Sequence, residues 1–241
     1  MKKLIAILLV GILLIGVASF LTIGFSYDRF EKKEQEHIIS LYKPYNSRIY
    51  TAEKDMQNEA LRNVAPMVDE FFELLPDEKA NEFRRKGWKI IISSQKPSYI
   101  TDMESSIEYK VGGNTEYNKR IIFVHLNELS KEYLLSDFIH EFGHFDDWEN
   151  GIASKTDDFV KIFKNNKGYV PEDAFEDVTY HLKSSREFFA CCYKDYFLYG
   201  DKLKSEAPEV YNFISNAVNN EKSEAEAFYM RIFNLNKKVD N

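Results

Sequence analysis

Two histidines stand four residues apart in the stretch DFIHEFGHFDDW, with a glutamate directly after the first of them. Residues four apart on a helix lie on one face, so a helix directs the imidazoles of His140 and His144 towards one point. Neutral imidazole is a good zinc ligand. Glu141 is rotated about 100° away on the helix, so it can reach a water molecule at the metal as a general base. The pattern therefore predicts a helix that carries a metal site.

The competing interpretation is a surface helix whose two histidines are solvated. The five-residue pattern arises by chance in about one chain in a hundred of this length and composition, so the spacing alone does not decide between the two. Apolar residues throughout the stretch indicate a packed helix, which suits a rigid site; they are Leu134, Leu135, Phe138, Ile139 and Phe142.

The first 26 residues differ from the rest of the chain. Lys2 and Lys3 precede an uncharged run from Leu4 to Ser26, which is long enough for a spanning helix of about 20 residues. An uncleaved signal anchor is one expectation. A cleaved signal peptide, with 17–19 as the small-residue cleavage site, is the other. Both place the rest of the chain outside the cytoplasm, at the cell surface or secreted, because the lysines stay inside.

Composition narrows the class of partner. The 241 residues are 44% hydrophobic, which is enough for one sizeable core. The net charge of -7 argues against nucleic acid as a partner. The two cysteines, Cys191 and Cys192, are adjacent, so they form neither a disulfide scaffold nor an obvious metal site. We expect both thiols to be buried in a helix and the chain to be a monomer.

The order of expected elements predicts an α+β fold, in which a small mixed sheet precedes a helical C-terminal half. Strands are expected at 88–92 and 120–125. Helices are expected at 28–42, 51–75, 76–86, 130–150, 155–165, 185–199, 207–219 and 222–235, with stops at Gly151, Gly168 and Gly200. The expected division is a signal segment at 1–26, a helical segment at 27–75 and a catalytic domain at 76–241.

A catalytic zinc ion needs a third protein ligand and an open fourth position. The candidate is Glu187, in the stretch SSREFFACC. Ser184 and Glu187 also form the Ser-x-x-Glu pattern of a capping box at the start of a helix. Spacing alone leaves both readings of Glu187 open.

The stretch HEFGHFDDW, followed 43 residues after its second histidine by EFFA, resembles the catalytic domain of anthrax lethal factor and the related Pro-Pro endopeptidases. The resemblance covers about 85–219 and implies a zincin-like fold that binds Zn²⁺. It implies that Glu187 is the third ligand. It also implies that Tyr180, seven residues earlier, hydrogen-bonds the oxyanion of the tetrahedral intermediate.

Two further positions follow from this resemblance. An acidic residue three after the second histidine matches the family, and here it is Asp147. It either orients a ligand from the second shell or is a solvated helix charge. The sequence departs from the family after Ala190, where relatives carry an acidic residue and this chain has Cys191 and Cys192. Because of that departure, the sequence does not show which side chains of this helix orient the metal ligands.

The remaining histidines have ordinary explanations. His37 falls in a charged helix and is expected to be solvated, and His125 ends a strand and is expected to be structural. His181 adjoins Tyr180 and could contribute to substrate binding, but zinc chemistry needs no further base.

The sequence therefore predicts a zinc-dependent metalloendopeptidase outside the cytoplasm that acts on peptide or protein substrates, with proline-containing ones among the candidates. Strand 120–125 is expected to be the edge along which an extended peptide pairs. One alternative is a catalytically silent binding module of the same fold at the cell surface. Another is a membrane-tethered structural protein that contacts partners through residues 28–75.

Overall fold

The computed structural model describes residues 29, 31–51, 59–93, 113–125, 131–172 and 179–235. The chain divides into two compact units, Met1–Leu41 and Tyr42–Asn241. In the first unit, residues 31–40 form a helix. The expected anchor or signal at 1–26 lies outside the described residues. Within the described part of the chain, no helix combines the length and apolar character that a membrane crossing requires.

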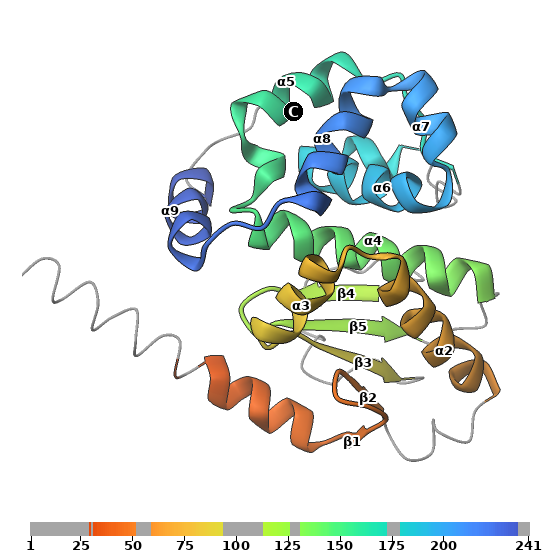
Figure 1. Cartoon of the computed structure of the whole chain (residues 1–241), viewed down its shortest axis with the longest axis vertical. Coiled ribbons are helices and arrows are strands. Elements are labelled where there is room, and N and C mark those ends of the chain that lie inside the picture. The colour runs from red at the N-terminus through yellow and green to blue at the C-terminus, as the bar shows by residue number, and fades with distance from the viewer. Residues whose placement is uncertain are drawn as a thin grey trace, which may run out of the picture. The chain divides into compact units, whose positions relative to one another are not determined.

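A mixed sheet of five strands forms one side of the second unit (Figure 1). Strands β2, β3 and β5 run parallel, whereas β1 and β4 pair antiparallel to their neighbours. The spatial order is β1 (Lys43–Pro44), β2 (Ile49–Thr51), β3 (Lys89–Ser93), β5 (Ile121–His125) and β4 (Gly113–Glu116). This small mixed sheet, with helices following it, confirms the predicted α+β class.

The expectation that strand 120–125 forms an open edge is wrong. Strand β5 lies between β3 and β4, and its backbone pairs with both of them. Among the described strands, β4 ends the sheet on this side. The sequence did not reveal this, because the four residues of β4 lie in a stretch rich in turn residues.

One face of the sheet packs against the helices and contributes to the hydrophobic core. Successive side chains of a strand point to opposite faces, and the register places Ile90, Ile122 and Thr115 side by side on the same face. Ile92, Val124 and Gly113 follow in the same way two residues further along. The apolar members of these rows are buried with the helices. The β-branched residues suit this packed, pleated surface.

The helix expected at 51–75 begins only at Glu59, and Thr51 belongs to strand β2; the other expected helices of the second unit begin and end within two residues of their expected positions. Gly87 and Gly151 follow α3 and α4 with φ of 77° and 78°, a conformation that favours glycine. The helix expected at 185–199 ends at Leu198, just before Gly200 as expected, and Gly200 begins a further short helix, α7 (Gly200–Glu206). The helices are α2 (Glu59–Leu74), α3 (Asp77–Arg85), α4 (Lys131–Glu149), α5 (Asp157–Asn165), α6 (Ser185–Leu198), α7 (Gly200–Glu206), α8 (Pro208–Asn219) and α9 (Glu224–Leu235).

Helix α4, which carries the two histidines, runs through the middle of the unit. It packs against β4 and β5 on one side and against α6 and α8 on the other. Figure 1 shows α4 between the sheet and the C-terminal helices. Its side chains from Ser136 to Asp147 are all buried. The helix is therefore held on both sides.

Residues 42–75 belong to the same compact unit as the helical half. Strand β2 pairs with β3, and α2 contributes Val68, Phe71 and Phe72 to the common core. The ring of Phe71 meets Phe142 of α4 edge-on, with 5.3 Å between the centroids. The boundary expected at residue 75 therefore falls inside this unit.

Buried ion pairs fasten α3 to α4. Lys79 pairs with Asp146 and also with Glu82, at 2.8 Å. Lys86 pairs with Glu149 at 2.8 Å and with Glu82 at 2.9 Å. Buried charges of this kind are tolerated only when each of them is paired. The cluster therefore makes the position of α3 depend on α4.

We expect Lys79→Met to lower the free energy of unfolding by about 3–5 kcal/mol, because it leaves the carboxylate of Asp146 buried without its cation. The check is urea denaturation of the full chain. Lys161→Met is the matched control, since Lys161 is exposed on α5 and should change stability by less than about 0.5 kcal/mol. Equal unfolding midpoints for the two variants would contradict the role given to the cluster.

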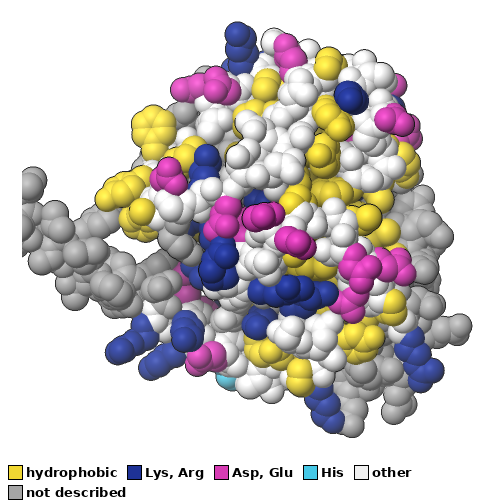
Figure 2. Space-filling model, in the orientation of Figure 1, with side chains coloured by type: hydrophobic (Ala, Val, Ile, Leu, Met, Phe, Trp, Pro, Cys, Tyr) yellow, Lys and Arg dark blue, Asp and Glu magenta, His cyan; other side chains and the backbone are white. Residues whose placement is uncertain are grey.

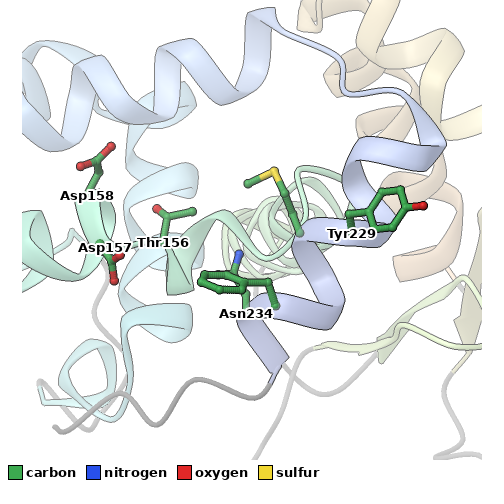
Figure 3. A pocket seen from close by; sticks show the side chains of 7 residues that line it. Thr156, Asp157, Asp158, Tyr229 and Asn234 are labelled. Carbon is green, nitrogen blue, oxygen red and sulfur yellow. The ribbon is translucent and has the colours of Figure 1, made fainter. Parts of the chain in front are cut away.

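The C-terminal helix α9 leaves apolar side chains exposed. Figure 2 shows hydrophobic side chains gathered where α9 lies in Figure 1; the exposed ones on α9 are Phe228, Tyr229, Ile232, Phe233 and Leu235. A pocket opens between α9 and the start of α5 (Figure 3), lined by Thr156, Asp157, Asp158, Tyr229, Met230, Phe233 and Asn234. None of these residues belongs to the histidine motif.

Candidate metal centre

The structure brings His140, His144 and Glu187 together. The histidines lie one turn apart on α4, and Glu187 lies in the first turn of α6. Glu187 Oε2 is 3.3 Å from His140 Nε2 and 3.5 Å from His144 Nε2. One ligand atom from each residue lies within 4.8 Å of the other two. This is the cluster expected from the sequence.

The donor set fits a zinc ion. Ligand atoms around a tetrahedral ion with bonds of about 2.0–2.1 Å stand about 3.3 Å apart, close to the two distances from Glu187. Glu187 Oε2 is buried and has no hydrogen-bond partner in the described part of the chain. Burial opposes its ionisation, yet His144 and His140 hold the pKa of Glu187 well below its ordinary value of 4.5. A negatively charged oxygen that faces two imidazole nitrogens is a suitable metal ligand.

Glu187 takes part in the helix cap through its backbone N–H, whereas its carboxylate faces the histidines. Ser184 is the N-cap of α6, and its hydroxyl accepts a hydrogen bond of 3.1 Å from the backbone N–H of Glu187. The side chain of Glu187 turns towards the histidines. The cap therefore fixes where α6 begins and so helps to place the carboxylate.

Gly143 sets the distance between α4 and α6. A Cβ added there would stand 2.9 Å from Cβ of Tyr193 and 3.1 Å from Cα of Ala190. Atoms of that kind do not approach so closely, so a larger residue would force the two backbones apart. The absence of a side chain at Gly143 is what lets Glu187 reach the histidines.

Tyr180 lies beside the cluster, in the short 3-10 turn Tyr180–Leu182 that precedes α6. Its ring centroid is 6.1 Å from that of His140. Burial raises the pKa of Tyr180 above its ordinary value of 10.0, and the charges of Glu187 and Glu141 raise it further. The phenol therefore keeps its proton and can donate a hydrogen bond at neutral pH.

Glu141 points to the sheet side of the cluster. Its carboxylate Oε2 accepts a hydrogen bond of 2.6 Å from the hydroxyl of Thr115 on β4. Among the residues that the structure describes, only this carboxylate oxygen has a hydrogen-bond donor, so the other oxygen is available to a water molecule. This arrangement is consistent with a base and not with a third ligand.

Asp147 is buried and is not the solvated charge that was one expectation. Its carboxylate accepts hydrogen bonds from the backbone and hydroxyl of Ser154, at 2.7 and 2.9 Å, and from Arg186 at 3.2 Å. The guanidinium of Arg186 lies 4.3 Å over the ring of Tyr117. That ring in turn meets His144 edge-on, with 6.3 Å between the centroids. Asp147 thus supports the cluster through intermediate residues.

Cys191 lies beside the imidazole of His140. Its Sγ is 3.6 Å from His140 Nδ1, while Nε2 of the same ring faces Glu187. A metal ion on Nε2 leaves the proton on Nδ1, which then donates to the sulfur. Both Cys191 and Cys192 are buried and unbonded, as expected. The thiol therefore takes the orienting place that a carboxylate or carbonyl usually holds.

The other three histidines lie outside the cluster. His37 is exposed on the helix of residues 31–40. His125 is buried at the end of β5, where its ring stacks on Phe123 with an interplanar angle of 8°. His181 is buried against Phe188. The exposure of His37 and the burial of His125 agree with what the sequence predicts for these two residues.

Three residues that shape the site were missed in the sequence. Gly143 carried a signal, because a glycine inside a helix costs about 1 kcal/mol relative to alanine and such a residue usually has a packing reason. Gly113 and Thr115 carried none, since their effect depends on a register that brings β4 beside α4.

We expect Gly143→Ala to destabilise the protein by about 1–3 kcal/mol and to weaken metal binding at least several-fold, because α6 must move away with Glu187. Thermal unfolding and a chelator-competition titration measure the two effects. Gly168→Ala is the control, because a Cβ there meets nothing within 4 Å. Higher stability of Gly143→Ala, as helix propensity alone predicts, would show that the two helices are not in close contact.

We expect Cys191→Ala to weaken metal binding by about 10-fold, the lower end of the range for an outer-shell partner. Cys191→Ser, which keeps an acceptor, should lose less. Cys192→Ala removes an equally buried thiol on the same helix and controls for packing. The same competition titration separates these cases. Equal affinities for Cys191→Ala and Cys192→Ala would mean that the thiol does not orient His140.

Comparison with known proteins agrees with this fold. The model of the family described as "Anthrax toxin lethal factor, N- and C-terminal domain" matches residues 31–217. Among solved structures, the PRO-PRO endopeptidase PPEP-2 from Paenibacillus alvei shares the fold, with a TM-score of 0.54 and 21% identity over 70% of this chain and 96% of that chain. No curated protein matches. Since the family model covers most of the sequence, the chain belongs to the anthrax toxin lethal factor family.

Proposed function

We propose that the protein is a zinc-dependent metalloendopeptidase. The observation that carries the proposal is the convergence of His140, His144 and Glu187, with Glu141 on the same helix and the phenol of Tyr180 beside His140. Membership of the lethal factor family supports it. The similar fold of a protein described as a PRO-PRO endopeptidase supports a peptidase of this kind.

His140, His144 and Glu187 would hold a zinc ion, which would act as a Lewis acid and lower the pKa of a water molecule. The protein's own residues do the rest. Glu141 accepts the proton of that water as it attacks the peptide carbonyl, and then passes it to the leaving amine. The burial of Glu141 in the middle of α4 keeps the carboxylate at a fixed place relative to the ligands.

Tyr180 stabilises the oxygen on which negative charge develops. Its hydroxyl is protonated at neutral pH, so it donates a hydrogen bond to the substrate carbonyl oxygen as that oxygen becomes an anion. It lies on the opposite element from Glu141, in the turn before α6. The base and the hydrogen-bond donor can therefore act on different sides of one carbonyl group.

The substrate in this proposal is an extended peptide that pairs with β4. The strand β4 ends the sheet among the described strands, and Thr115 of the same strand touches Glu141. A peptide added to that edge runs beside the cluster. Proline-containing peptides are the first substrates to test, because the structural relative is described as a PRO-PRO endopeptidase.

The proposed place of action is outside the cytoplasm. The support is in the sequence alone, where Lys2 and Lys3 precede the apolar run from Leu4 to Ser26. Substrates at the cell surface or secreted from it would then be within reach.

The test is metal analysis and peptide cleavage with the full chain in detergent, beside Glu141→Gln. We expect one zinc ion per chain in both proteins and cleavage of a proline-containing peptide library by the parent protein. The variant should lose activity by a factor of about 10²–10⁴, the usual contribution of a general base. Glu209→Gln, on the exposed face of α8, is the matched control.

The other outcomes separate the alternatives. Zinc binding without cleavage of any peptide would support a silent binding module of the same fold. A protein that binds no zinc when supplied with it would overturn the proposal.

A further inference from the structure

We propose that Thr115 and Gly113 of strand β4 are positioning residues that fix the rotamer of Glu141. The inference rests on the proposed function, in which Glu141 is the general base. It adds a pair of residues outside the histidine motif on which the base depends. One residue of the pair holds the carboxylate, and the other leaves the space that the side chain occupies.

Thr115 holds the carboxylate. Its hydroxyl is 2.6 Å from Glu141 Oε2 and 3.0 Å from the backbone oxygen of Glu141. A hydroxyl has only one proton to donate. It donates this proton to Oε2 of Glu141, because that contact is the shorter one and a carboxylate oxygen is the stronger acceptor. Both Thr115 and Glu141 are buried, so water competes little for this bond.

Gly113 leaves the space. A Cβ at this position would stand 2.5 Å from Cγ and 3.2 Å from Cδ of Glu141. It would also stand 3.1 Å from the backbone oxygen of Phe123, so it has no free direction in which to move. A side chain at Gly113 would therefore displace the side chain of Glu141. This steric restriction at Gly113 is independent of the hydrogen bond from Thr115.

The strand fixes both residues at once. Gly113 and Thr115 are two apart, so they share the face of β4 that packs on α4. Their partners across the antiparallel pair are Val124 and Ile122, which are fully buried in β5. The sheet thus places both the hydroxyl of Thr115 and the space at Gly113 beside the side chain of Glu141.

The position of this carboxylate matters for the rate. A glutamate side chain has several rotatable bonds, and a general base must lie within hydrogen-bond reach of the proton that it takes. The rotamer selected by β4 uses Oε2 for Thr115 and leaves Oε1 for the water. Without that selection, Glu141 spends only a fraction of its time in the productive position.

The experiment compares Thr115→Val, Thr115→Ser and Gly113→Ala in the zinc-loaded full chain. Valine keeps the shape of threonine and removes the hydroxyl, while serine keeps the hydroxyl. We expect Thr115→Val to lower kcat on the order of 10- to 100-fold, the range for losing a bond to a charged group, with KM and zinc content unchanged. Thr115→Ser should recover most of that loss. Gly113→Ala should lower kcat without loss of zinc.

Thr51→Val is the matched control. Thr51 is a buried threonine on β2 of the same sheet, and its hydroxyl has no hydrogen-bond partner among the residues that the structure describes. The Thr51→Val protein should have the same kcat as the parent protein. A Thr115→Val protein with full kcat would overturn the inference, and so would one whose zinc affinity falls in proportion to kcat.

A second measurement does not depend on activity. Crystal structures of the parent protein and of Thr115→Val show where the carboxylate of Glu141 lies. We expect it within 3 Å or so of the Thr115 hydroxyl in the parent and turned away in the variant. An unmoved carboxylate overturns the inference. A parent that binds zinc but cleaves nothing would end the proposed function, while a displaced carboxylate in the variant would still support the positioning.

Discussion

The approach of α6 to α4 at Gly143 is the contact on which the rest of the site depends. Two histidines on one helix supply two ligands, but the third comes from another helix. That ligand arrives only because the backbones pass close together where Gly143 has no side chain. Ser184 then decides where α6 begins, and so which residue meets the histidines.

The surroundings of α4 explain why such a polar helix can be buried. Aromatic rings from α2 and α6 pack around Phe142, whereas three of the buried acids near the end of the helix have specific counterparts. Asp146 and Glu149 meet the lysines of α3, and Asp147 meets Arg186. Burying this many charges is tolerable because they are paired. The pairing also leaves little freedom for the helix to rotate, which keeps the ligands in place.

The parts that follow from local spacing could be predicted from the sequence. His140 and His144 share a helix face, and the Ser184 cap marks the start of α6. The place of Glu187 near the histidines needed a family resemblance, because no local rule says which glutamate a fold brings back. The strand order could not be predicted. Strand β4 has only four residues and is rich in turn formers, so its side chains are too few to show a period of two. The sequence alone therefore favours β5 as the edge.

The register between β4 and β5 makes the site sensitive to insertions and deletions. Because strand side chains alternate, one residue added in the turn between Glu116 and Ile121 would turn that whole strand over. The side chain of Asn114 would then point at Glu141 in place of the gap, and the hydroxyl of Thr115 would face the other side of the sheet. Point substitutions on this strand change one contact each, whereas a single-codon insertion in that turn would remove all of them together and leave the histidine motif untouched.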